Sequence, residues 1–272
     1  MGKIRIGCQT YTWQMSGEKY LDSLEQIIQV VSRAEYVGLE PETQFLGRLW
    51  DPLLMQEILA ANQLELAALT LAEDWLNPEE TDEERARADR TIEFLKSFPD
   101  TILATVQMPG RDRSHLKERQ ENLLKCVNAI AARAHDQGIP CTYHPNSPGG
   151  SVVRTEEDYA FFLDGLDSSV IGYAPDVGHI AKGGMDPLEI IKQYRSLVNH
   201  VHYKDMNADG VWAMMGDGVL DFVGITTYLR DSGYGGWIIV EDECPRAVDE
   251  PDEVTLEDGV YVKAQLLPSI AA

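Results

Sequence analysis

Cysteine is scarce in this sequence, and the cysteines are far apart. The four residues Cys8, Cys126, Cys141 and Cys244 form no C-x-x-C pair. This spacing excludes a zinc ribbon and gives no disulfide framework. We therefore expect reduced, buried thiols in a cytoplasmic protein.

Long hydrophobic runs and basic residues are also scarce. No stretch approaches the roughly 18 apolar residues that span a bilayer, and the first residues do not read as a secretory signal. Lys and Arg number 23 against 45 Asp and Glu, a formal net charge of −22. This acidity argues against nucleic-acid and membrane partners, because both attract basic surfaces. The same acidity favours metal cations over polyanions as charged ligands.

Eight short apolar, β-prone runs recur along the chain, and each is followed by a helical pattern. The runs lie at 4–8, 36–39, 64–71, 102–108, 140–143, 170–174, 198–202 and 237–240. Helices are expected at about 18–34, 51–62, 79–97, 114–137, 155–165, 186–195, 221–232 and 255–267. Eight strand–helix cycles predict one parallel sheet, and this length fits a closed (β/α)8 TIM barrel. We expect a single domain over residues 1–272. An open doubly wound sheet is disfavoured because no GxGxxG follows the first run.

Histidine and carboxylate residues lie at the ends of the last four predicted strands. In a TIM barrel, side chains at the carboxyl ends of the strands converge on the active site. The residues at these ends are His144, Asp176, His202 and Glu241. Imidazole and carboxylate ligands suit a hard or borderline divalent ion. We predict one such ion, Mn²⁺ by preference, with Co²⁺, Mg²⁺, Zn²⁺ or Fe²⁺ as alternatives.

Two histidines lie on the seventh predicted strand. We expect only one of His200 and His202 to face the barrel interior. We expect His202 inside, because Lys204 then points inward as well. A Ser-based nucleophile is disfavoured, since no GxSxG elbow accompanies the histidines.

Five segments resemble those of a known family. They are 143–145 (Tyr-His-Pro), 176–187 (Asp-Val-Gly-His through Asp-Pro), 200–205 (His-Val-His-Tyr-Lys-Asp), 216–222 and 233–241. On these segments the chain resembles the xylose-isomerase-like TIM barrels. That group contains sugar phosphate isomerases and epimerases, inosose dehydratases and an abasic-site endonuclease branch. The resemblance covers nearly the whole chain.

The resemblance implies roles for particular residues. It places the family's metal ligands on His144, Asp176, His202 and Glu241, a substrate contact on His179 and the family's lysine on Lys204. Position 144 departs from the pattern, because many members carry Glu there as a ligand and acid/base. Residues 146–150 also differ from the second His and Gly-Thr that follow in dehydratase-like members.

The implied chemistry is proton removal next to a carbonyl through a metal-stabilised enediolate. We expect a sugar isomerase or epimerase acting on a sugar, keto-sugar or cyclitol. The alternative is a dehydratase or β-eliminating lyase on a keto-inositol or keto-sugar. Remote alternatives are an abasic-site endonuclease and a non-catalytic metal-binding subunit. The sequence is compatible with both a monomer and a homo-oligomer.

The predicted site residues fall into two overlapping groups. The catalytic group is Glu241, His179 and Lys204, with Glu40 and Glu42 as further candidates for the general base. The substrate-binding group is Glu42, Gln107, Asn146, His179, Lys204 and Trp13. Trp13, Trp75 and Trp212 fall in predicted loops, where each could stack on a sugar ring or pack internally. Lys204, Arg154 and Arg246 are the cations near predicted loops, so an uncharged substrate is favoured over a phosphorylated one.

Overall fold

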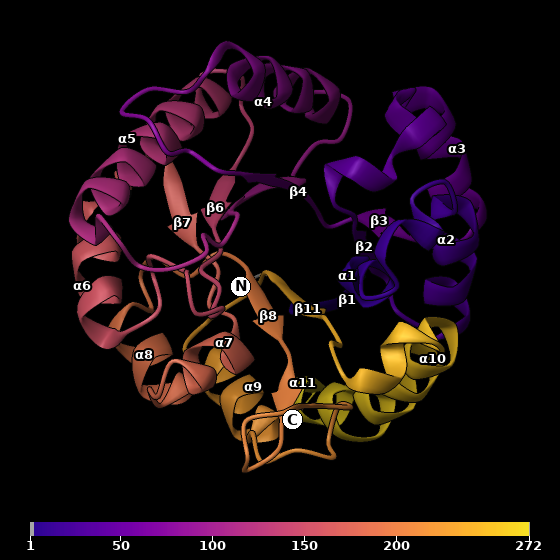
Figure 1. Ribbon diagram of the computed structural model, residues 1–272. Helices are drawn as coiled ribbons and strands as arrows, with labels where there is room; N and C mark the ends of the chain where they lie inside the picture. The colour runs from indigo at the N-terminus through magenta and orange to yellow at the C-terminus, as the bar shows by residue number, and fades with distance from the viewer. Residues whose placement is uncertain (1–2, 272) are drawn as a thin grey trace. The chain divides into compact units, whose positions relative to one another are not determined.

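The computed structural model describes residues 3–271, and Figure 1 names its helices and strands. The chain divides into two compact units. Unit 1 combines the residues up to Ala67 with those from Val201 onward, and unit 2 is Ala68–His200. None of the helices within residues 3–271 combines the length and apolarity needed to cross a membrane.

Unit 1 contains a parallel sheet of five strands in the order β3-β2-β1-β11-β8. The strands are β1 (Arg5–Gln9), β2 (Gly38–Glu40), β3 (Glu65–Leu66), β8 (Val201–Tyr203) and β11 (Trp237–Val240). The main helices of this unit are α1 (Tyr11–Gln14), α2 (Leu24–Arg33), α3 (Pro52–Ala61), α9 (Phe222–Asp231), α10 (Pro251–Tyr261) and α11 (Leu267–Ala271). Gly38 is required in β2, because a Cβ there would lie 2.4 Å from the Trp237 ring.

A small antiparallel hairpin of β9 (Asp205–Met206) and β10 (Trp212–Ala213) follows β8. Asp205 organises the loop beyond it by accepting hydrogen bonds from the backbone N–H groups of Gly216 and Gly218, each at 3.0 Å. A Cβ on Gly218 would lie 2.1 Å from Asp205 Oδ1, so the carboxylate needs glycine at this position.

Unit 2 contains a parallel sheet of four strands in the order β4-β5-β6-β7. These are β4 (Ala68–Glu73), β5 (Ile102–Gln107), β6 (Cys141–Tyr143) and β7 (Ile171–Tyr173). Its helices are α4 (Asp82–Leu95), α5 (Leu116–His135), α6 (Glu156–Gly165), α7 (Val177–Lys182) and α8 (Pro187–Gln193). Thr81 and Thr155 begin α4 and α6 with capping boxes, which satisfy otherwise unpaired N–H groups at each helix start.

All eight predicted strand regions contain strands, and the predicted helices are present with shifted ends. Three details differ from prediction. The run at 64–71 is divided at Ala67 into β3 and β4, which pair in different sheets. The helix expected at 18–34 is a 3-10 turn (Gly17–Tyr20) followed by α2. Helix α7 was not predicted, because six residues are too few to show helical periodicity.

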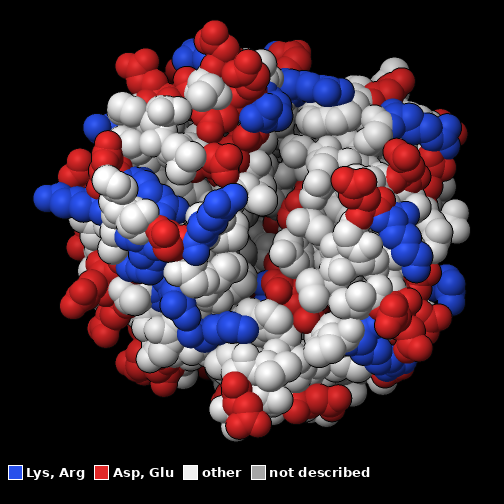
Figure 2. All heavy atoms as spheres, in the orientation of Figure 1, with Lys and Arg blue, Asp and Glu red and all other residues white. Residues whose placement is uncertain are grey.

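The acidic excess is largely exposed. Figure 2 shows Asp and Glu side chains scattered over the face displayed, with Lys and Arg among them. A smaller group of carboxylates is buried instead, among them Glu40, Asp176, Glu241, Asp242 and Asp258. Burying a charge is costly unless it is paired or neutralised, so these carboxylates are the ones whose surroundings need explanation.

Candidate active site

The first buried histidine–carboxylate pair lies in unit 2. His144 directly follows β6, and Asp176 lies three residues beyond the end of β7. His144 Nε2 is 3.4 Å from Asp176 Oδ2, and Asp176 is fully buried. The other oxygen, Oδ1, accepts the N–H of His179 at 2.7 Å and so caps α7. The helix start therefore orients the carboxylate and directs Oδ2 toward the histidine.

His179 is fixed from both ends. Its backbone N–H is held by Asp176, and its ring Nδ1 shares a hydrogen bond of 2.8 Å with the Ser147 hydroxyl. The His179 ring also meets the His144 ring edge-on, with centroids 5.8 Å apart. The structure thus brings three predicted site residues together in unit 2. Ser147 was missed, and its place in the Asn-Ser-Pro turn after His144 was the available signal.

Two predicted substrate-binding residues of unit 2 use their amide groups to hold loops. Gln107 Nε2 donates to the carbonyl of Asp74 at 2.9 Å, and Asn146 Nδ2 donates to the carbonyl of Gln107 at 2.6 Å. Ser151 donates to Asn146 Oδ1. These contacts fasten the loops after β4, β5 and β6 to one another beside His144.

The second buried pair lies in unit 1. His202 is in β8, and Glu241 directly follows β11, the neighbouring strand. His202 Nδ1 is 2.9 Å from Glu241 Oε2. The ring's other nitrogen, Nε2, lies 3.1 Å from both carboxylate oxygens of Glu40, the last residue of β2. Each ring nitrogen of His202 therefore faces a buried carboxylate.

This arrangement changes the proton affinity of His202. Burial lowers the pKa of its imidazole, but the charges and hydrogen bonds of Glu40 and Glu241 outweigh burial and raise the pKa to about 10. Buried carboxylates that hold a proton this firmly create a strongly negative electrostatic potential around the ring. The same surroundings suit a metal cation, since imidazole and carboxylate are ligands for divalent ions.

Lys204 is fully buried beside Glu241. Its Nζ donates to Glu241 Oε1 at 2.7 Å and also contacts Glu243. The ammonium lies 5.6 Å from the ring centroid of Tyr11 and 5.3 Å from that of Trp212. His202 and Lys204 thus contact the same carboxylate, as expected for two residues on one face of a strand. The roles of Tyr11 and Glu243 were not foreseen.

Glu42 lies two residues beyond β2 and is buried. Burial is the main cause that raises the pKa of its carboxyl to about 8, and the charge of Glu241 adds to it. Gln44 Nε2 donates to Glu42 Oε2 at 2.7 Å, and Thr10 Oγ1 accepts the Glu42 backbone N–H at 3.0 Å. At neutral pH this carboxyl is therefore largely protonated and can give up a proton.

The predicted stacking of Trp13 on a sugar ring is wrong for this structure. Trp13 is 0% exposed, and its Nε1 donates to Asp252 Oδ1 at 2.7 Å. Trp75 is also 0% exposed. Both rings are packing residues without a face open to a ligand. Trp212 is half-buried beside Lys204 and keeps its predicted role as a stacking candidate.

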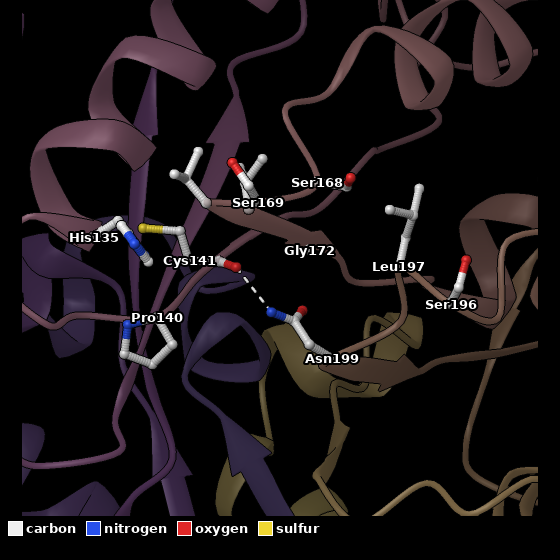
Figure 3. A pocket seen from close by; sticks show the side chains of 11 residues that line it. His135, Pro140, Cys141, Ser168, Ser169, Gly172, Ser196, Leu197 and Asn199 are labelled. Atoms are coloured by element: carbon white, nitrogen blue, oxygen red, sulfur yellow. Dashed lines mark hydrogen bonds between the residues drawn. The ribbon is translucent and has the colours of Figure 1, made fainter.

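A surface pocket of about 280 Å³ occupies a different part of unit 2. Figure 3 shows its lining, in which Asn199 Nδ2 donates to the carbonyl of Cys141 at 2.8 Å. It is lined by residues at the amino ends of β6 and β7, whereas His144 and Asp176 follow the carboxyl ends. Side chains at amino ends in such folds generally serve stability. We therefore do not assign the reaction to this pocket.

Comparison with known proteins identifies the fold. A family model described as "Xylose isomerase-like TIM barrel" matches residues 18–263. Inosose dehydratase of Lacticaseibacillus casei is 24% identical over 274 residues, covering 90% of each chain. Among solved structures, the zinc-binding IOLI protein aligns with a TM-score of 0.75 and 15% identity over 98% of both chains. D-Psicose 3-epimerase from Clostridium cellulolyticum H10 aligns with a TM-score of 0.74 and 14% identity, over 96% of this chain and 99% of that one. The predicted TIM barrel fold is confirmed.

Proposed function

This chain belongs to the family of xylose isomerase-like TIM barrels, and we propose that it is a divalent-metal-dependent sugar isomerase or epimerase. The observation that carries the proposal is the pair of buried histidine–carboxylate contacts. His144 meets Asp176 in unit 2, and His202 meets Glu241 in unit 1. All four residues lie at or beyond the carboxyl halves of parallel strands, where TIM barrels place their active sites.

We assign one divalent ion to these four side chains. The donor set fits, because two imidazoles and two carboxylates offer four ligands without a thiolate. Mn²⁺ is our first choice, and the zinc in the IOLI protein makes Zn²⁺ the leading alternative. When bound, the ion would supply positive charge that polarises carbonyl and hydroxyl oxygens and stabilises the negative charge left by proton removal.

The protein's own groups would move the proton. Glu241 is the proposed base, and Lys204 Nζ, which donates to Glu241 Oε1 at 2.7 Å, orients its carboxylate. Glu42 is the proposed acid, supported by burial and by a pKa raised to about 8. His179 is the proposed substrate contact in unit 2, held in place by Ser147.

The charge balance around Lys204 supports an uncharged sugar, keto-sugar or cyclitol as substrate. Its ammonium already contacts two carboxylates, Glu241 and Glu243. Arg246, another of the three cations singled out near loops, pairs with Glu250 and Glu257. Neither therefore offers a full positive charge to a phosphate.

A dehydratase acting on a keto-inositol or keto-sugar is the second candidate. The similarity to inosose dehydratases favours it, and it shares the first proton abstraction with the isomerase. The candidates diverge afterwards, since an isomerase returns the proton and a dehydratase expels a β-hydroxyl group.

The proposal treats residues 1–272 as one catalytic domain, and the continuous family match over residues 18–263 supports this. We further propose that the enzyme works in the cytoplasm. The finding that Cys8, Cys126, Cys141 and Cys244 are all free thiols supports this. The oligomeric state stays a prediction.

One experiment tests the function. The protein is stripped of metal, reconstituted with Mn²⁺ and incubated in D₂O with ketoses, 3-keto-sugars and inososes. Proton NMR should show deuterium entering next to the carbonyl of at least one substrate, only in the Mn²⁺ sample. Deuterated isomers would establish the isomerase, and loss of water would establish the dehydratase. Absence of exchange with every substrate and metal would refute both.

A further inference from the structure

Glu40 is a fully buried carboxylate that the proposed reaction does not use. We propose that it is a positioning residue, which fixes the proton of His202 on Nε2 and so presents Nδ1 to the metal. This inference rests on the proposed function, because it requires that His202 is a metal ligand. It assigns a task to a residue on β2, which supplies none of the four proposed ligands.

The contact geometry defines the task. Both oxygens of Glu40 lie 3.1 Å from His202 Nε2. An ionised carboxylate can only accept hydrogen bonds, so in the metal-free protein both ring nitrogens carry a hydrogen, Nδ1 toward Glu241 and Nε2 toward Glu40. Metal binding at Nδ1 would release that hydrogen as a proton and leave the Nε2 hydrogen, which Glu40 holds through both oxygens. In a neutral imidazole the other nitrogen then has the free lone pair, which is the form that binds a metal. A contact through both oxygens also restricts rotation of the ring more than a single hydrogen bond does.

The second nitrogen points to the proposed metal site. His202 Nδ1 is 2.9 Å from Glu241 Oε2, the other proposed ligand of unit 1. A cation bound by both Nδ1 and this oxygen would lie on the side of the ring away from Glu40. Glu40 therefore acts through His202, without being a ligand itself. Partners of this kind orient the histidines of many metal sites, and their loss typically weakens metal binding about 10- to 100-fold.

Burial makes the contact between Glu40 and His202 energetically important. Glu40, His202 and Glu241 are each at most 3% exposed. An unpaired carboxylate at this depth would carry a large desolvation penalty. Pairing with the imidazole offsets that penalty, and the backbone of β2 fixes the carboxylate at the strand end. Glu40 is thus held more firmly than a carboxylate on a loop.

The first test measures Mn²⁺ affinity by calorimetry on metal-free, full-length protein. We expect one ion per chain in the wild type and about 10- to 100-fold weaker binding in Glu40→Ala. Glu40→Gln should recover part of the loss, because its side-chain oxygen can still accept the Nε2 hydrogen. Glu73→Gln is the matched control, since Glu73 is also buried, is also the last residue of its strand, β4, and pairs with Arg87. Equal weakening by the Glu40 and Glu73 substitutions would overturn the proposal in favour of a general effect of removing a buried carboxylate.

The second test reads the proton position and needs no variant. Nitrogen NMR of ¹⁵N-histidine-labelled, Zn²⁺-loaded wild type should show His202 with hydrogen on Nε2 and metal on Nδ1. Hydrogen on Nδ1 and metal on Nε2 would overturn the proposal and make Glu40 a neighbour of the ion. A wild type that binds neither Mn²⁺ nor Zn²⁺ would refute the metal-dependent function and this inference together. One ion bound equally well by wild type and Glu40→Ala would refute this inference alone.

Discussion

The two histidine–carboxylate pairs are similar in composition but are held in different ways. In unit 2, Asp176 is fixed by a backbone N–H at the start of α7. In unit 1, Glu241 is fixed by charged side chains, with His202 on one oxygen and Lys204 on the other. The backbone N–H that holds Asp176 does not titrate, whereas every side chain that holds Glu241 does. The comparison teaches that the unit 2 pair is oriented by helix geometry and the unit 1 pair by charged neighbours whose protonation depends on pH.

The largest effect is expected from Asp176→Asn. Asparagine also caps helices well, so α7 should persist while the carboxylate charge is lost. We expect bound metal to disappear and activity to fall by at least about 100-fold, because a direct ligand should matter more than an outer partner. Metal analysis and kinetics check this. Asp186→Asn is the control, since Asp186 caps α8 in the same unit, and it should retain metal and activity.

Glu42→Gln tests the pH sensitivity of unit 1. The pKa of Glu42 is raised from 4.5 to about 8 in the folded protein. Its protonation therefore stabilises the fold fully below pH 4.5, and this contribution is lost as the pH rises from 4.5 to 8. In chelator, the unfolding free energy of the wild type should fall relative to Glu42→Gln across that range. Urea titrations at pH 5, 6.5 and 8 measure the difference, and a difference independent of pH would contradict the assignment.

Several of these features were open to prediction from sequence. Strand ends can be read from apolar runs, and the barrel rule placed His144, Asp176 and Glu241 just beyond β6, β7 and β11, where the structure has them. His202 is instead the middle residue of β8. The expectation that only one of His200 and His202 faces inward was wrong, because residues two apart on a strand share a face. Ligand atoms of both histidines lie within 4.8 Å of each other and of Glu40. The loop motif around Gly218 was also visible, and the structure explains it through its contact with Asp205.

Other features depend on contacts that linear spacing does not carry. Glu40 and His202 are 162 residues apart, and neither strand pattern reveals which carboxylate reaches which ring nitrogen. Trp13 looked available for stacking, because its partner Asp252 lies 239 residues further on. Asp176 was predicted as a ligand, but its second task as a helix cap required α7 to be seen.

A pair of tryptophan variants separates packing from substrate contact within unit 1. Trp13→Phe removes the buried hydrogen bond to Asp252 and should lower the unfolding free energy by about 1–3 kcal/mol, with kcat retained. Trp212→Phe, at a half-buried ring, should leave stability nearly unchanged and raise KM. Denaturation and steady-state kinetics on both proteins check this. The reverse pattern would restore Trp13 as a substrate contact.

The smallest effect is expected from Ser147→Ala in unit 2. The change removes the hydroxyl that pairs with His179 Nδ1, a loss of about 1 kcal/mol. A rise in KM of several-fold with unchanged metal content is the expected result, measured by kinetics and metal analysis. Loss of the metal itself would show that His179 is coupled to the ion more tightly than its contacts indicate.

The central proposal is that His144, Asp176, His202 and Glu241 hold one divalent ion. The most direct measurement is the number of Mn²⁺ ions bound per chain in wild type, Asp176→Asn and His202→Asn. One ion in the wild type and none in either variant is the predicted result. Full Mn²⁺ binding in either variant, or two independent ions in the wild type, would contradict the claim.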